Sequence, residues 1–168
     1  GAFEALRAGR VDAAFVYLPV ERDGADLVVE PVLHEDMVAA VPAASPLARA
    51  AGVTLELLHR ETRVLFPRRA MPERFDEIVG HFARAGLRPR VRTVGPSLYE
   101  ALSVVAAGKG VSIVPRRASE AHDDLAVALR PVADVAALWT LAAVTLAKPP
   151  PGARELVAAL RRKELGAR

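Results

Sequence analysis

The sequence LSVVAAGKGVSIVP, residues 102–115, places the end of a helix, a tight turn and a strand next to one another. Ser97 upstream is a good N-cap for this helix. Gly108 can end the helix, because glycine adopts the left-handed backbone conformation at little cost. The mostly apolar residues 111–114 are typical of a buried strand. Together with the extended residues 90–94, this segment predicts a strand, helix, strand unit.

Strands and helices alternate along the rest of the chain. Apolar runs bounded by turn residues predict strands, and segments that begin at a cap or proline and end at glycine predict helices. This alternation favours an α/β fold with mostly parallel sheets covered on both faces. Strands are expected at 11–16, 27–32, 37–41, 63–66, 125–129 and 138–146, and helices at 3–8, 54–59, 72–85 and 153–165.

The composition is that of a globular protein that needs no covalent or metal support. Of the 168 residues 52% are apolar, and there is no cysteine, which excludes disulfides, thiolate nucleophiles and cysteine-based metal sites. No apolar run approaches the roughly 20 residues of a membrane-spanning helix, and no secretion signal opens the sequence. We therefore expect a soluble, cytoplasmic chain that has no contact with a membrane.

The net charge of +3 is too small and too evenly spread to predict a nucleic-acid-binding surface. Catalytic sites are equally hard to find. There is no Gly-x-Ser-x-Gly motif, and Gly108 and Gly110 do not form part of a dinucleotide-binding pattern. The histidines His34, His59, His81 and His122 fall at unrelated spacings, so we expect no metal site. Because the motifs above are missing, we also expect no catalytic residue and no cofactor.

Three stretches, taken in order and at their observed spacing, resemble the effector-binding domain of LysR-type transcriptional regulators. They are EALRAGRVDAAF at 4–15, VAAVPAASPLA at 38–48 and LSVVAAGKGVSIVP at 102–115. The resemblance implies an α/β fold of the periplasmic-binding-protein type 2 class, with two Rossmann-like lobes joined by two hinge strands.

The resemblance also implies a division of the chain. Residues 1–36 and 129–168 would form the first regulatory lobe, which is incomplete at its N-terminus, and residues 37–128 the second. The connections near Glu35 and Leu129 would be the hinges. Complete family members carry a winged helix-turn-helix upstream, which is absent from this sequence, so we expect the chain to be a fragment.

In such a fold a small ligand binds in the cleft between the lobes, at strand ends and helix N-termini that favour an anion. Arg68 and Arg69 can bind a carboxylate through paired hydrogen bonds, although adjacent arginines after a strand also suit a solvated turn. Ser97 is first an N-cap, and Tyr17 is equally suited to a structural role. The candidate ligand-binding residues are Tyr17, Leu18, Pro67, Arg68, Arg69, Ser97 and Leu98.

The function implied is ligand-controlled transcription. A small-molecule effector, a carboxylate in our interpretation, would change the relative orientation of the lobes in a homodimer or homotetramer. DNA would be bound only through the missing N-terminal domain. The alternative is a solute-binding protein of a transporter, which uses the same fold. A third interpretation, an enzyme, lacks a catalytic constellation.

Overall fold

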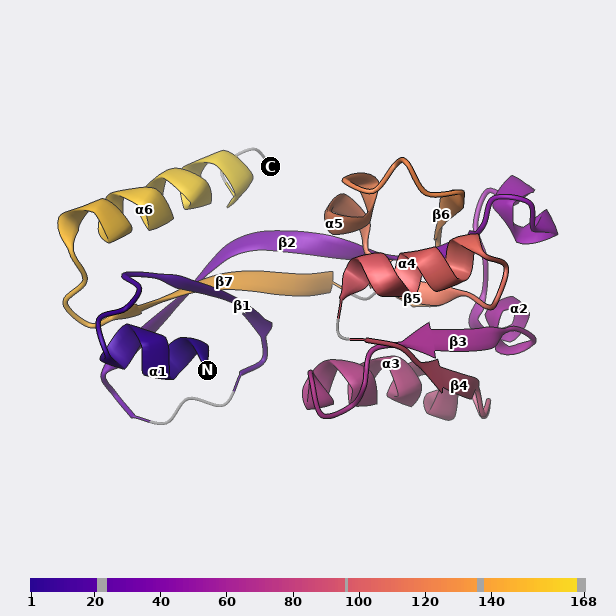
Figure 1. Cartoon of the computed structure of the whole chain (residues 1–168), viewed down its shortest axis with the longest axis horizontal. Helices are drawn as coiled ribbons and strands as arrows, with labels where there is room; N and C mark the ends of the chain where they lie inside the picture. The colour runs from indigo at the N-terminus through magenta and orange to yellow at the C-terminus, as the bar shows by residue number, and fades with distance from the viewer. Residues whose placement is uncertain (21–23, 96, 136–137, 166–168) are drawn as a thin grey trace. The chain divides into compact units, whose positions relative to one another are not determined.

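The computed structural model describes residues 1–20, 24–95, 97–135 and 138–165. The chain forms two compact units (Figure 1). Unit 1 consists of Gly1–Glu35 and Leu138–Arg168, and unit 2 of Asp36–Ala137. Among the described residues, no helix is both long and apolar enough to cross a membrane.

Unit 1 is a small sheet with a helix on each face. Strand β1 (Ala14–Leu18) pairs antiparallel with β7 (Leu138–Leu146), and β7 neighbours the first part of β2 (Leu27–Pro42). Alternate residues of a strand face opposite sides of the sheet. Val144 of β7 accordingly packs with α1 (Ala2–Arg7), whereas Ala143 packs with α6 (Pro151–Leu165).

Unit 2 is a larger α/β unit. Its strands and helices alternate along the chain as the sequence predicts. In chain order they are the second part of β2, η1 (Pro46–Arg49), α2 (Leu55–His59), β3 (Thr62–Leu65), α3 (Pro72–Arg84), β4 (Arg90–Thr93), α4 (Leu98–Ala106), β5 (Ser112–Pro115), α5 (Arg116–Glu120) and β6 (Val127–Pro131).

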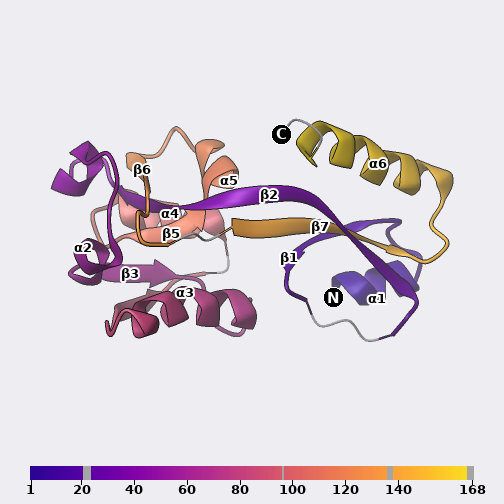
Figure 2. The ribbon, with the colours of Figure 1, turned by 180° about the vertical axis from the view of Figure 1, so that it is seen from behind.

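Helices α3 and α4 cover opposite faces of β3. Arg63 lies under Phe82 of α3, whereas its neighbour Val64 packs into the core beneath α4 with Leu102 and Val105. Figure 2 shows the same two helices on either side of β3 from behind. Strand β3 is therefore covered on both faces, as the sequence predicts, whereas the residues of its neighbour β4 are exposed.

The prediction of mostly parallel sheets is wrong. Strand β3 is parallel to β4, and Arg63 forms a parallel bridge with Val111, but β2 pairs antiparallel with both β5 and β6, and β1 with β7. A run of apolar residues shows that a strand is buried, but it does not show the direction of the partner strand. The strands predicted separately at 27–32 and 37–41 are likewise one continuous strand, β2.

The units meet along the chain at two points. One follows Glu35, within β2, and the other follows Ala137, which itself lies outside the described residues. The sequence placed the second connection earlier, near Leu129. Strand β6 instead belongs to unit 2, because Leu129 pairs with Ala40 of β2. The role of the two connections as hinges stays a prediction.

Candidate functional site

The two predicted effector-binding loops of unit 2 leave the same edge of the sheet. Strands β3 and β4 run parallel, with Leu65 opposite Thr93, and the Val94 amide donates a hydrogen bond to the Leu65 carbonyl at 2.9 Å. The loop after Leu65 and the turn after Val94 therefore begin side by side. In open α/β sheets, ligands bind outside such carboxyl ends of parallel strands.

The first loop presents two arginines on a tight turn. The Ala70 amide donates to the Pro67 carbonyl at 2.9 Å, which closes the turn, and Pro67 itself is half-buried. Arg68 and Arg69 are both exposed. The structure thus places Pro67, Arg68 and Arg69 together at the edge where the sequence predicted a ligand.

Arg68 is already engaged by a carboxylate. Its Nε donates to Asp76 Oδ1 at 2.8 Å, and its Nη2 donates to Oδ2 at 2.6 Å. These hydrogen bonds hold the pKa of Asp76 below its ordinary value and raise the pKa of Arg68 above its ordinary value. Both side chains are more than half exposed, at 61% and 52%, so the pair is a surface ion pair.

Arg69 differs from Arg68 in its contacts. Within the described part of the chain, it makes no hydrogen bond and no ion pair. It is therefore the guanidinium of this loop that a ligand can reach without breaking an existing contact.

The second turn leads into α4. Ser97 is the N-cap, as predicted, and its amide donates to Glu100 Oε2 at 3.3 Å. A Cβ at Gly95 would overlap the Glu100 carboxylate, so glycine at this position allows the carboxylate to lie over the start of the helix. Leu98 packs against the core of unit 2 and does so without a ligand. Pro96, in the middle of the predicted turn, lies outside the described residues.

The two predicted site residues of unit 1 lie at the end of β1. The Tyr17 hydroxyl donates to Glu35 Oε2 at 2.8 Å, and the Tyr17 ring meets the Trp139 ring edge-on at 5.2 Å. Burial, followed by the Glu35 contact, raises the pKa of Tyr17. Leu18 lies opposite Thr140 of β7. Contact of Tyr17 and Leu18 with an effector stays a prediction.

Three acidic residues near these positions were missed by the sequence reasoning: Glu35, Asp76 and Glu100. Only Glu100 has a local signal, because Ser97-x-x-Glu100 is the spacing of a capping box. Asp76 meets Arg68 across a loop and a turn of helix. Glu35 of β2 meets Tyr17 of β1 because both strands flank β7 in the sheet. Neither contact follows a short sequence motif.

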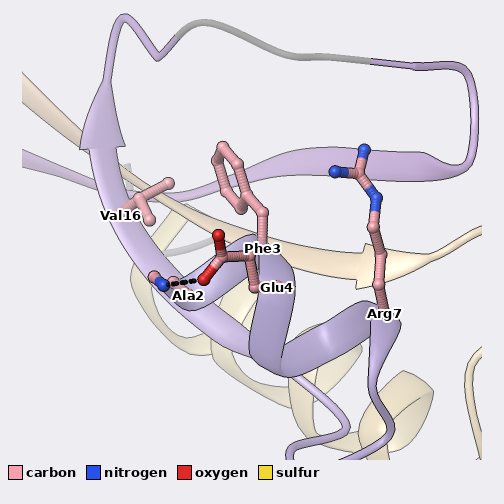
Figure 3. Close-up of a pocket in the computed structure, with 6 residues that line it drawn as sticks. Ala2, Phe3, Glu4, Arg7 and Val16 are labelled. Carbon is pink, nitrogen blue, oxygen red and sulfur yellow. Dashed lines mark hydrogen bonds and ion pairs between the residues drawn. The ribbon is translucent and has the colours of Figure 1, made fainter.

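A pocket of about 320 Å³ lies in unit 1 between α1 and β1, and none of the predicted residues lines it. Figure 3 shows Phe3 and Glu4 of α1 beside Val16 of β1. The Glu4 carboxylate forms an ion pair with the Gly1 amino group at 2.5 Å. Arg7, also on this pocket, donates to Asp26 at 2.7 Å. The Arg7 guanidinium is thus engaged within unit 1, and we do not assign this pocket as the effector site.

A second pocket, of about 290 Å³, lies in unit 2 and is lined by Pro42, Ala44, Ser45, Glu61, Gly108, Gly110 and Val111. It lies at the start of β3 and β5, the edge opposite the two predicted loops. Among the residues that the structure describes, no group of three or more histidine, aspartate and glutamate side chains could hold a metal ion.

Known proteins resemble this chain along most of its length. A family model described as the LysR substrate binding domain matches residues 1–164. The HTH-type transcriptional regulator TtuA of Agrobacterium vitis is 35% identical over 113 residues, 66% of this chain and 36% of that protein. The HTH-type transcriptional regulator CatR of Pseudomonas putida is 35% identical over 120 residues, 71% of this chain and 40% of that protein.

Among solved structures, the BenM effector-binding domain with its effector benzoate aligns with a TM-score of 0.77 and 26% identity, over 96% of this chain and 72% of that one. BenM is a regulator of Acinetobacter baylyi. The chain spans less than half the length of TtuA and CatR.

Proposed function

The chain belongs to the LysR substrate-binding domain family, and from this membership we propose that it is the part of a transcriptional regulator that senses a small organic anion. Its fold is the type 2 periplasmic-binding-protein fold of LysR effector-binding domains. The observation that carries the proposal on the effector is the turn at the carboxyl edge of β3, which presents Arg68 and Arg69 on a loop that begins beside the connection to α4.

A carboxylate suits this edge of the sheet for physical reasons. A guanidinium forms paired, charge-assisted hydrogen bonds with a carboxylate, and the start of a helix carries partial positive charge. The related BenM domain has benzoate, itself a carboxylate, as its effector. We propose Arg69 and Arg68 as the main contacts, with Ser97, Leu98 and Pro67 beside them, and Tyr17 and Leu18 as contacts from unit 1.

Control of transcription requires that the effector binds two conformations of the protein unequally. We propose that the effector changes the relative orientation of the two units in a homodimer or homotetramer. DNA would be bound by another part of the regulator, in the cytoplasm, and no reaction would be catalysed. The regulators TtuA and CatR, which this chain resembles, support this proposal. The alternative of a transporter's solute-binding protein is not supported.

The test is a calorimetric titration of the 168-residue chain with benzoate, aliphatic acids, an amine and a neutral aromatic compound. We expect a carboxylate to bind best, and Arg69→Ala to weaken its binding by about one to two orders of magnitude, since a charge-assisted pair contributes about 1.5–3 kcal/mol. Arg60→Ala removes another exposed arginine of unit 2 and is the control.

Preferred binding of a neutral or cationic compound would contradict the proposal of an anionic effector. Unchanged carboxylate affinity in both Arg68→Ala and Arg69→Ala would show that these arginines form only a solvated turn.

A further inference from the structure

Two internal carboxylates already occupy positions where the proposed effector would bind. The first is Asp76, on the second turn of α3. It accepts hydrogen bonds from Nε and Nη2 of Arg68, at 2.8 and 2.6 Å, and so covers one complete edge of that guanidinium. A ligand carboxylate that approached this edge would find both donors engaged.

The second internal carboxylate is Glu100, on the first turn of α4. Its Oε2 accepts from the Ser97 amide at 3.3 Å, one of the donors that make a helix start favourable for an anion. The carboxylate also fills the space beside Gly95, where a Cβ would overlap it. The same sheet edge therefore has two donor sites that the protein itself has partly neutralised.

The segment around Arg68 contains equal numbers of basic and acidic residues. Between residues 66 and 78 the arginines Arg68, Arg69 and Arg74 are matched by Glu73, Asp76 and Glu77. Arg74 contacts Glu77 at 2.6 Å, and Arg68 contacts Asp76. Among the described residues only Arg69 of these arginines is without an ionic or hydrogen-bonded contact.

We infer that Asp76 and Glu100 are specificity-determining residues, which compete with the anionic effector for Arg68 and for the start of α4. This inference rests on the proposed function, because it takes the effector to be an anion bound at this edge. An effector carboxylate binds Arg69 directly and reaches the Asp76-covered edge of Arg68 only when Asp76 leaves. The exchange is feasible because exposed ion pairs contribute little to stability.

The experiment measures benzoate binding by NMR, through the Nε–H signals of arginine, in the wild-type chain and in Asp76→Asn. We expect Asp76→Asn to bind benzoate about two- to fivefold more tightly, the range expected for release of one exposed ion pair. In Asp76→Asn the Arg68 Nε–H signal should respond to benzoate. The gain should disappear in the double variant Arg68→Ala, Asp76→Asn.

Glu56→Gln is the matched control, because Glu56 also forms an exposed ion pair in unit 2, with Arg60 at 3.9 Å, but lies on α2. It should leave benzoate affinity unchanged. Glu100→Gln should add a smaller gain to that of Asp76→Asn, because glutamine loses the charge but can still accept the Ser97 hydrogen bond.

The outcomes separate this inference from the proposed function. If Arg69→Ala weakens binding but Asp76→Asn binds no more tightly than Glu56→Gln, the inference is overturned and the anion site stands. If Asp76→Asn binds benzoate more weakly than wild type, Asp76 orients Arg68 and does not compete. If neither wild type nor Asp76→Asn binds benzoate, the inference is also overturned, because a freed guanidinium should hold a carboxylate.

Discussion

Arg63 is a charged residue in the middle of an apolar layer. Its side chain is fully buried on β3, its guanidinium lies 5.0 Å from the centre of the Phe82 ring, and Nη2 donates to the Leu58 carbonyl. Nε and Nη1 have no hydrogen-bond partner among the described residues. Burial lowers the pKa of Arg63 to about 10. Such burial opposes folding, because a charge loses its hydration and regains only part of it.

We predict that Arg63→Met stabilises unit 2 by about 1–3 kcal/mol, because it removes the charge and its unpaired donors and keeps a long side chain. Arg63→Ala should be destabilising, because it leaves a cavity under Phe82. Urea unfolding followed by circular dichroism gives both values. A loss of stability in Arg63→Met would mean that the guanidinium contributes more through Phe82 and Leu58 than its burial costs.

The Arg68–Asp76 ion pair should make a contribution to stability that depends on pH, and this can be followed through the pKa of Asp76. The folded-state pKa of Asp76 is held below its ordinary value by Arg68. The pair therefore contributes stability above the unfolded pKa of about 3.9 and loses it as the pH falls through the folded pKa. Arg68→Ala should raise the pKa of Asp76 toward its ordinary value, whereas Arg60→Ala should not change it. Carbon-13 NMR of the carboxyl group tests this, and an unmoved pKa would show that the pair does not persist in solution.

The turn between α4 and β5 contains two glycines, and glycine is required at each position for a different structural reason. Gly108 has φ +70° and open space where a side chain would begin. Gly110 has φ +146°, and a Cβ there would overlap the Thr62 carbonyl oxygen. That carbonyl accepts the Val111 amide hydrogen at 2.9 Å, so the overlap falls on the contact that joins β3 to β5.

We predict that Gly108→Ala costs about 1–2 kcal/mol, from its left-handed backbone alone. Gly110→Ala should cost more than Gly108→Ala, on the order of 3 kcal/mol or above, because it adds a steric overlap that backbone movement must relieve. Gly152→Ala on α6, where space is open, should be neutral or stabilising by about 0.5–1 kcal/mol. Denaturant midpoints rank the three variants. Equal losses for Gly108→Ala and Gly110→Ala would contradict the assigned overlap.

For the whole chain, the net charge of +3 is small. All of the excess lies in unit 2, because the basic and acidic residues of unit 1 are equal in number, and several arginines are engaged in ion pairs. We predict that the chain has no specific affinity for promoter DNA, and that any residual binding falls steeply between 50 and 200 mM salt, as expected of phosphate contacts alone. Fluorescence anisotropy with a promoter fragment and a scrambled fragment is the measurement. Nanomolar, sequence-dependent binding at physiological salt would refute this prediction.

Several features of the molecule follow from short stretches of sequence. The Thr54 and Ser97 caps, the end of α4 at Gly108 and the bounds of β7 were all predicted, because capping residues, glycine and apolar runs act over a few neighbouring positions. The turn with Pro67, Arg68 and Arg69 could also be placed after a strand for this reason. The short helices η1 and α5 were missed, because one turn of helix leaves too little periodicity to recognise.

Local patterns of residues were therefore enough to predict the α/β alternation, the family and the positions of the candidate arginines along the chain. The antiparallel pairing of β2 with β5 and β6, and the contacts of Arg68 with Asp76 and of Tyr17 with Glu35, became known from the folded structure alone. The difference lies in distance along the chain. Caps and apolar periods depend on adjacent residues, whereas strand direction and charge pairing depend on which separate elements pack together.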